Sequence, residues 1–154
     1  MITIVNEREQ LMETKKLSST DISDAEWEIM RIIWTLNQAH TKEIINEIQK
    51  KKSWSDSTIK TLIRRLTKKG LLKTEQDGRG FLYCPVVSQT DMMFDATQAL
   101  LNRMCNMHKG EVIFNLVKNA PISKSDLEKI KVEIDKKMET APEIVACNCL
   151  KKEN

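Results

Sequence analysis

The sequence has little of what enzymes and membrane proteins need. No apolar run approaches the roughly 18 residues that span a bilayer, and the N-terminus lacks the features of a signal peptide. Only His40 and His108 are available as histidine bases, and there is neither a glycine-rich phosphate loop nor a carboxylate pair in an apolar setting. Aromatic residues make up 5% of the chain and do not alternate with basic ones, which disfavours single-strand binding. We expect a cytoplasmic, non-catalytic protein with no membrane partner.

Charge is present in quantity and is unevenly distributed. The 154 residues are 40% hydrophobic and 31% charged, as in one or two globular units. Residues 40–80 contain eleven Lys and Arg against five Asp and Glu, whereas residues 88–141 contain eight of each kind. A basic excess confined to one module predicts a surface for phosphate. A solvated lysine-rich surface is the alternative.

Apolar residues recur at helical spacing in the first part of the chain. A capping box, Ser23-x-x-Glu26, predicts a helix that runs to about Asn37. Thr41 is expected to cap a second helix, which should end within Lys50–Lys52 because cations favour a helix C-terminus. Both helices have an apolar stripe that can enter a common core.

The third helix is followed by a change in pattern. Ser55 or Asp56 can cap this helix, and Gly70 can end it as a left-handed residue. Leu71–Gln76 and Phe81–Val87 have the composition of strands, and an Asp-Gly turn joins them. Three helices and a hairpin with a basic tip are in the order of a winged helix-turn-helix. The fold class we predict is mainly α with a small β-hairpin.

Three more helices are predicted at residues 88–104, 109–119 and 123–138, the first starting near Ser88-x-x-Asp91 and the last capped by Ser123-x-x-Asp126. Helices totalling about 50 residues cannot enclose much core alone, so a second copy is expected to cover their apolar stripes. The expected organisation is a flexible N-terminal arm, a winged-helix DNA-binding domain, a helical dimerisation domain and a Cys-x-Cys tail, with the bounds 1–20, 21–87, 88–140 and 141–154.

The positions of the four cysteines, 84, 105, 147 and 149, are not typical of a disulfide framework. Cys147 and Cys149 are one residue apart, and in a reducing cytosol such thiols suit a soft metal better than a bridge. Cys84 and Cys105 are expected to be buried hydrophobes. The spacing Cys105-x-x-His108 is compatible with a metal site but arises often by chance.

Three sequence segments resemble the penicillinase-repressor family. They are ISDAEWEIMRIIW at 22–34, STIKTLIRRLTKKG at 57–70, and TEQDG at 74–78, the last resembling the copper-responsive branch in particular. The similarity extends from about Ile22 to Met138. It implies a winged-helix domain, a helical dimerisation domain, and a homodimer that represses transcription from a palindromic double-stranded operator.

The polar face of the third helix is the candidate contact surface for such an operator. Short polar side chains lie near its start and basic ones further along, which suits bases and then phosphates. The residues expected to face the groove are Ser57, Thr58, Lys60, Thr61 and Arg64, and those expected near the backbone are Lys68 and Arg79. Thr58 as a second cap and Arg65 as the partner of an acid are alternatives. Trp27, Trp34 and Trp54 are expected to pack and not to stack on bases.

The resemblance implies one of two inducing signals. In the β-lactam branch a protease cuts an Asn-Phe bond, but here Leu116 follows Asn115, which counts against proteolysis. The copper branch ends in a cysteine tail, commonly two Cys-x-Cys pairs, of which one is present here. This branch implies Cu(I) as inducer, Zn(II) as a candidate resting metal, copper-transport genes as targets and a copper chaperone as a candidate partner. A regulator with an unrelated signal is the other alternative.

The missing pair changes the expected chemistry of the tail. Two thiolates can hold Cu(I) but cannot complete a tetrahedral Zn(II) site. The sequence therefore favours a four-thiolate site across the dimer, with Cys147 and Cys149 from both protomers.

Overall fold

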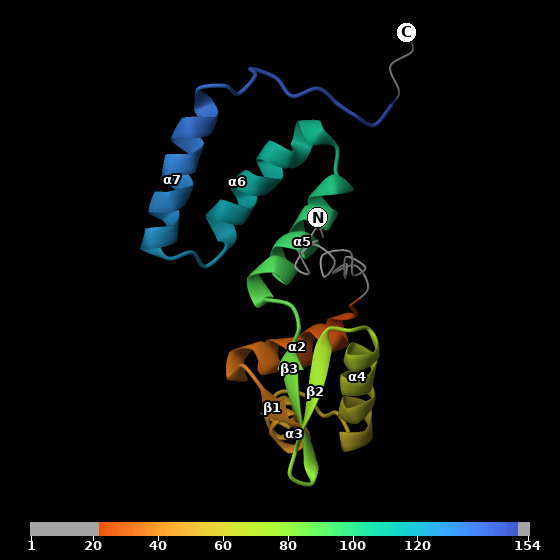
Figure 1. The fold of residues 1–154 in the computed structure, drawn as a ribbon. Helices are drawn as coiled ribbons and strands as arrows, with labels where there is room; N and C mark the ends of the chain where they lie inside the picture. Colours follow the sequence, from red (N-terminus) through yellow and green to blue (C-terminus); the bar gives the residue numbers. More distant parts are fainter. Residues whose placement is uncertain (1–21, 151–154) are drawn as a thin grey trace, which may run out of the picture. The chain divides into compact units, whose positions relative to one another are not determined.

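The computed structural model describes residues 22–150 (Figure 1). The predicted arm, residues 1–20, and the last four residues of the tail lie outside the described residues. The chain divides after Thr97 into two compact units. The first contains α2 (Asp24–Leu36), β1 (Ala39–His40), α3 (Thr41–Gln49), α4 (Asp56–Lys68), β2 (Leu72–Asp77), β3 (Gly80–Pro85) and the start of α5 (Gln89–Asn102). The second contains the end of α5, η3 (Asn106–His108), α6 (Lys109–Asn119) and α7 (Lys124–Met138).

The predicted fold class is confirmed: the described chain is mainly helical and its first unit is a winged helix-turn-helix. None of the helices within residues 22–150 has the length and apolar character to cross a membrane.

The capping box at the start of α2 is confirmed. The Glu26 amide donates to Ser23 Oγ (3.3 Å), and the Ser23 amide donates to Glu26 Oε2 (3.0 Å). The helix ends at Asn37, whose positive φ of 65° is uncommon outside glycine and is found more often for asparagine than for most residues.

The predicted cap of the second helix is wrong by one residue. His40 is the extended N-cap residue, and its amide donates to Glu43 Oε2 (2.8 Å), while Thr41 is the first residue of α3. The shift has a tertiary cause, because His40 pairs with Leu82 as part of β1 and is thereby held extended. The helix ends at Gln49, before the lysine run.

Helix α4 has both of its predicted end signals. Of the two candidate caps, Ser55 is the N-cap, and it accepts a hydrogen bond from the Thr58 amide (3.2 Å). Gly70 has a φ of 79°. The Gly70 amide bonds the Thr67 carbonyl (3.0 Å) and the Leu71 amide bonds the Leu66 carbonyl (3.0 Å). These two bonds form a Schellman motif, which requires the left-handed residue that glycine supplies.

The sheet has one strand more than the predicted hairpin. Its order is β1-β3-β2, and all pairs are antiparallel. Asp77 pairs with Gly80, so the turn has only two central residues, Gly78 (φ +59°) and Arg79. This places the Arg79 side chain at the exposed tip of the wing.

One apolar core lies under the three helices and the sheet of the first unit. Its fully buried members come from α2, α3, α4, the segment before β2, and α5: Ile29, Met30, Ile33, Ile44, Ile48, Ile59, Ile63, Leu66, Leu71 and Met92. The packing role predicted for the tryptophans is confirmed, since Trp34 is buried and Trp27 and Trp54 pack against the core. The Trp34 indole N–H also donates to the Val87 carbonyl (2.9 Å), which fastens α2 to the end of the wing.

A buried carboxylate joins the start of α2 to the end of α4. Glu26 is 2% exposed, and its Oε2 lies 2.6 Å from Lys69 Nζ. Burial alone would raise the pKa of Glu26, but hydrogen bonds from Lys69 and the Ser23 amide, with the charges of Lys69 and Arg65, outweigh burial and lower the pKa.

Glu26→Gln should lower the free energy of unfolding by about 1–3 kcal/mol at pH 7, because it removes the buried carboxylate from its ion pair with Lys69 and from the capping box. The lowered pKa of Glu26 means that this stabilisation is complete above the unfolded pKa, about 4.3. It is lost as the pH falls through the lower folded pKa. Urea unfolding should therefore show a wild-type advantage that shrinks below about pH 4.

The control is Glu28→Gln on the same helix, which removes the exposed pair with Arg31 and should cost less than about 0.5 kcal/mol. Equal losses for Glu26→Gln and Glu28→Gln would show that the buried pair adds nothing.

Candidate nucleic-acid interface and thiol cluster

Helix α4 separates an apolar side from a polar side. Ile59, Leu62, Ile63 and Leu66 are buried. Ser57, Thr61, Arg64 and Lys68 succeed one another at three- and four-residue spacing, so they share the opposite face. Of the predicted contact residues, only Thr61 is half-buried. The others are exposed: Ser57, Thr58, Lys60, Arg64, Lys68 and Arg79.

Hydroxyl groups at the start of α4 are bonded to one another. Ser55 Oγ lies 2.9 Å from both Ser57 Oγ and Thr58 Oγ1. Thr58 is therefore not a second cap, since Ser55 already accepts the amide bond of this turn. Thr61 Oγ1 donates to the Ser57 carbonyl (2.8 Å), which leaves its methyl group and oxygen lone pairs for an external contact.

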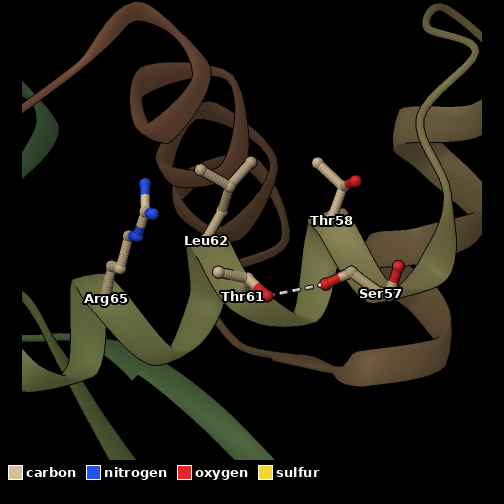
Figure 2. Close-up of a pocket in the computed structure, with 5 residues that line it drawn as sticks. All are labelled: Ser57, Thr58, Thr61, Leu62 and Arg65. Atoms are coloured by element: carbon tan, nitrogen blue, oxygen red, sulfur yellow. Dashed lines mark hydrogen bonds between the residues drawn. The ribbon is translucent and has the colours of Figure 1, made fainter.

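A pocket with a volume of about 270 Å³ lies along one flank of this helix (Figure 2). Its lining residues are Ser57, Thr58, Thr61, Leu62 and Arg65. Arg65 is exposed and was not among the predicted contacts, although its spacing of four from Thr61 places it on the same flank. The charge of Arg65 acts on Glu26, but within residues 22–150 Arg65 has no ion pair with an acid.

The cations among the predicted contact residues lie on α4 and at the tip of the wing. Within residues 22–150, none of Lys60, Arg64, Lys68 and Arg79 forms an ion pair. Lys73, by contrast, pairs with Glu75 (2.9 Å) on the same strand. A cation without an internal partner can neutralise a phosphate without first losing a salt bridge.

Two polar clamps hold the elements around α4. The Gln49 side-chain amide donates to the Trp54 carbonyl (3.0 Å) and to Asp56 Oδ1 (2.8 Å), which ties the end of α3 to the start of α4. His40 Nε2 lies 3.1 Å from Asp77 Oδ2, and its Nδ1 lies 3.2 Å from the Phe81 carbonyl oxygen. Both sides of the wing are therefore fastened to the start of α3.

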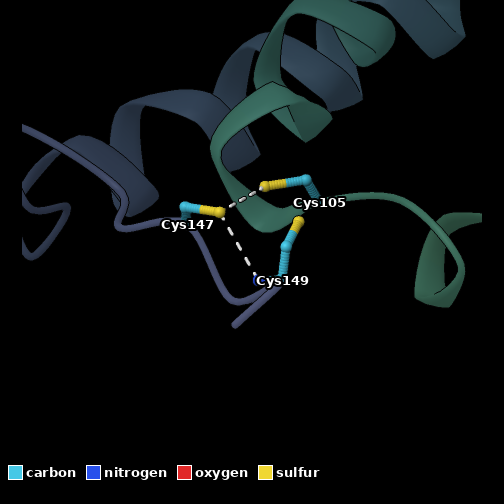
Figure 3. A group of neighbouring side chains, drawn as sticks. All are labelled: Cys105, Cys147 and Cys149. Atoms are coloured by element: carbon cyan, nitrogen blue, oxygen red, sulfur yellow. Dashed lines mark hydrogen bonds between the residues drawn. The ribbon is translucent and has the colours of Figure 1, made fainter. Parts of the chain in front are cut away.

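Three cysteines meet in the second unit (Figure 3). Cys105, between α5 and η3, faces Cys147 and Cys149 of the tail, and the three sulfurs lie within 4.8 Å of one another. The hydrogen-bonded sulfurs of Cys105 and Cys147 are 3.4 Å apart, and the Cys149 amide donates to Cys147 Sγ (3.4 Å). We call Cys105, Cys147 and Cys149 the thiol cluster.

The prediction that Cys84 and Cys105 are buried hydrophobes is wrong, since both are half-buried. Cys105 joins the tail cysteines across 42 positions of sequence, a separation that no local motif reveals. Cys84 Sγ lies 4.0 Å from Gln38 Oε1 and is not part of the thiol cluster. Among the described residues, the metal-compatible group does not include His108.

The surroundings of the thiol cluster favour a thiolate. A hydrogen bond from the Met107 backbone, with bonds from Cys147 and Cys149, lowers the pKa of Cys105 to about 7. The bond to Cys105 in turn raises the pKa of Cys149 to about 11. Thiolates are the metal-binding form of cysteine. Three sulfurs bound to one ion at about 2.3 Å stand about 4 Å apart, so this cluster can bind a metal ion.

The second unit leaves much apolar surface uncovered in the single chain. No residue of α6 or α7 is buried. The exposed large apolar side chains of these two helices are Ile113, Phe114, Leu116, Leu127, Val132, Ile134 and Met138. Apolar surface of this extent is typical of an interaction site.

Comparison with known proteins gives a consistent set of similarities. Residues 22–136 match the family described as penicillinase repressor. The chain is 44% identical over 133 residues to a 16.5 kDa protein in the ptsI 3' region of Latilactobacillus sakei, covering 86% of this chain and 91% of that one. It is 35% identical over 117 residues to the methicillin resistance regulatory protein MecI of Staphylococcus aureus strain N315, covering 76% and 95%. The solved CopR repressor structure is similar at 44% identity, with a TM-score of 0.39, over 44% of this chain and 99% of that one.

Proposed function

The chain belongs to the penicillinase-repressor family, and we propose that it represses transcription through the polar face of α4. Members of this family are DNA-binding transcriptional repressors and not enzymes. In this proposal α4 enters the major groove of a palindromic operator. Ser57, Thr58, Lys60, Thr61 and Arg64 face the bases, and Lys68 and Arg79 contact phosphates. The observation that carries the proposal is a row of exposed cations along α4, Lys60, Arg64 and Lys68, which form no ion pair within residues 22–150.

A homodimer is the second part of the proposal. Family repressors bind operator DNA, typically as dimers. The exposed apolar side chains of α6 and α7 support dimerisation here, because a second copy would remove them from water. We propose residues 21–87 as the DNA-binding domain, 88–140 as the dimerisation domain and 141–154 as the tail. Two-fold symmetry of the dimer requires a palindromic operator.

The third part of the proposal is that Cu(I) at the tail cysteines induces release from DNA, with copper-transport genes under control in the cytoplasm. Soft thiolate ligands select Cu(I), which accepts low coordination numbers. Zn(II) remains the candidate resting metal. Neither the comparisons nor residues 22–150 support the predicted copper chaperone.

The test is operator release under anaerobic conditions. With a palindromic duplex selected by the metal-free protein, one equivalent of Cu(I) per chain should weaken wild-type binding by about 10- to 100-fold, an ordinary coupling between two sites. The Cys147→Ser/Cys149→Ser variant should stay bound, and Cys84→Ser should respond like the wild type. Identical binding with and without Cu(I) for all three proteins would show that the signal is another one, proteolysis included.

A further inference from the structure

We infer that Cys105 completes a three-thiolate Cu(I) site with Cys147 and Cys149 of the same chain, one site per protomer. The inference rests on the proposed metal response of the tail, and it adds a ligand and an architecture to that response. It replaces the expected four-thiolate site between protomers with a site inside each protomer.

The geometry places the third ligand within reach of a shared ion. All three sulfurs lie within 4.8 Å of one another, and Figure 3 shows them gathered where the tail passes the segment around Cys105. Three sulfurs around one ion need separations of about 4 Å. Small side-chain rotations therefore suffice, and no movement of the helices is needed.

The number of thiolates favours Cu(I) over Zn(II). Structural Zn(II) sites are four-coordinate and tetrahedral, so three cysteines leave one position open. Cu(I) is soft and is selected by thiolate sulfur. Among the described residues no fourth Cys, His, Asp or Glu joins the thiol cluster. The ligand set therefore closes around Cu(I) and stays incomplete around Zn(II).

Two backbone amides donate hydrogen bonds that hold the tail in place. The Asn106 amide donates to Asn148 Oδ1 (2.9 Å), which fixes the residue between the two tail cysteines against the residue that follows Cys105. The Cys149 amide donates to Cys147 Sγ, a contact that also stabilises sulfur as an anion. Such outer contacts orient metal ligands before the ion arrives.

Metal binding at this site would also affect the helices that are proposed to form the dimer. Cys105 precedes α6 and Cys147 follows α7, so an ion bound to both closes a loop that contains both helices. Closing a loop restricts the conformations of the chain inside it. Metal binding would thereby act on the two helices whose apolar side chains are proposed to form the dimer, which gives the tail a physical means of altering operator affinity.

The test is Cu(I) binding by the full chain, in competition with a colorimetric Cu(I) chelator under anaerobic, reducing conditions. We expect one Cu(I) per chain for the wild type and for Cys84→Ser. Cys105→Ser should weaken binding by more than about 100-fold, and Asn148→Ala, which keeps every sulfur, by about tenfold. Thermal unfolding of the metal-free proteins checks that each variant is folded.

Two results would overturn the inference. One is a Cys105→Ser variant that is folded and binds Cu(I) like the wild type. The other is one Cu(I) per two wild-type chains, the stoichiometry of a site between protomers. The proposed function fails separately: if Cu(I) binds as expected but does not release DNA, the three-thiolate site stands and the copper signal does not.

Discussion

Arg64→Ala/Lys68→Ala is expected to weaken operator binding by about 100- to 1000-fold while leaving the fold intact. Both side chains are exposed, and neither forms an ion pair with another residue of the described range 22–150, so their removal costs the first unit little. A base contact by arginine contributes about 1–3 kcal/mol of discrimination against the wrong base. Each lost phosphate contact lowers the slope of log affinity against log salt concentration by about one. Because both protomers carry the substitutions, the logarithmic slope of affinity against salt should fall by about 2–4. Fluorescence anisotropy at several salt concentrations measures both quantities.

The matched control is Lys129→Ala/Lys136→Ala on α7. It removes the same charge from two exposed lysines that pair with Asp126 and Glu133. If binding depended only on net charge, the two double variants would lose equal affinity. That outcome would contradict a specific role for α4, whereas unchanged binding by the α7 variant supports it.

Ile134→Lys is expected to dissociate the dimer and, with it, operator binding. Ile134 is 52% exposed in the single chain and shares a face of α7 with Leu127, seven residues before it, and Met138, four residues after it. A buried isoleucine contributes about 1.5–3 kcal/mol. In a two-fold interface the loss counts twice, and a lysine adds the cost of desolvating a charge. The dimer dissociation constant should rise by at least about 100-fold, as measured by sedimentation equilibrium.

The matched control is Glu133→Gln, which also raises the charge by one. Glu133 is the neighbour of Ile134 on α7 and forms an ion pair with Lys136. This substitution should leave the dimer unchanged. If Ile134→Lys also stays dimeric, α7 is not the interface, and the exposed apolar residues of α5 and α6 become the candidates.

The parts of the fold that could be predicted are those encoded by neighbouring residues. Ser23 and Glu26 predict a helix start, Gly70 predicts a helix end, and the Asp-Gly pair predicts the turn of the wing. Each is a local signal, because the groups that satisfy the backbone lie within a few residues. The face of α4 follows for the same reason, from helical spacing.

The parts that were missed depend on residues far apart in sequence. A two-residue strand such as β1 has no periodicity to detect, and His40 is extended because it pairs with β3. Cys105 looked like a lone hydrophobe, since its partners stand 42 and more positions away. Arg65 was not among the predicted contacts, because the pocket forms only where Thr58, Thr61 and Arg65 lie along one flank of α4.

The proposed DNA-contact surface lies in the first unit and the thiol cluster lies in the second. In the first unit, Ser55 and Gly70 fix where α4 begins and ends, and the clamps of Gln49 and His40 hold its neighbours. In the second, a soft-metal ligand set is attached to the helices with the exposed apolar side chains. A signal at the thiol cluster would reach DNA by changing how two copies are held together.

The most direct test of DNA recognition by two copies is to select binding sites for the purified full chain from a random-sequence duplex library and to count the chains on the selected site. We predict a palindrome whose half-sites are centred about 10 base pairs apart, or a multiple of that distance, bound by two chains. Absence of any enriched sequence, or one chain bound per site without sequence preference, would contradict the account.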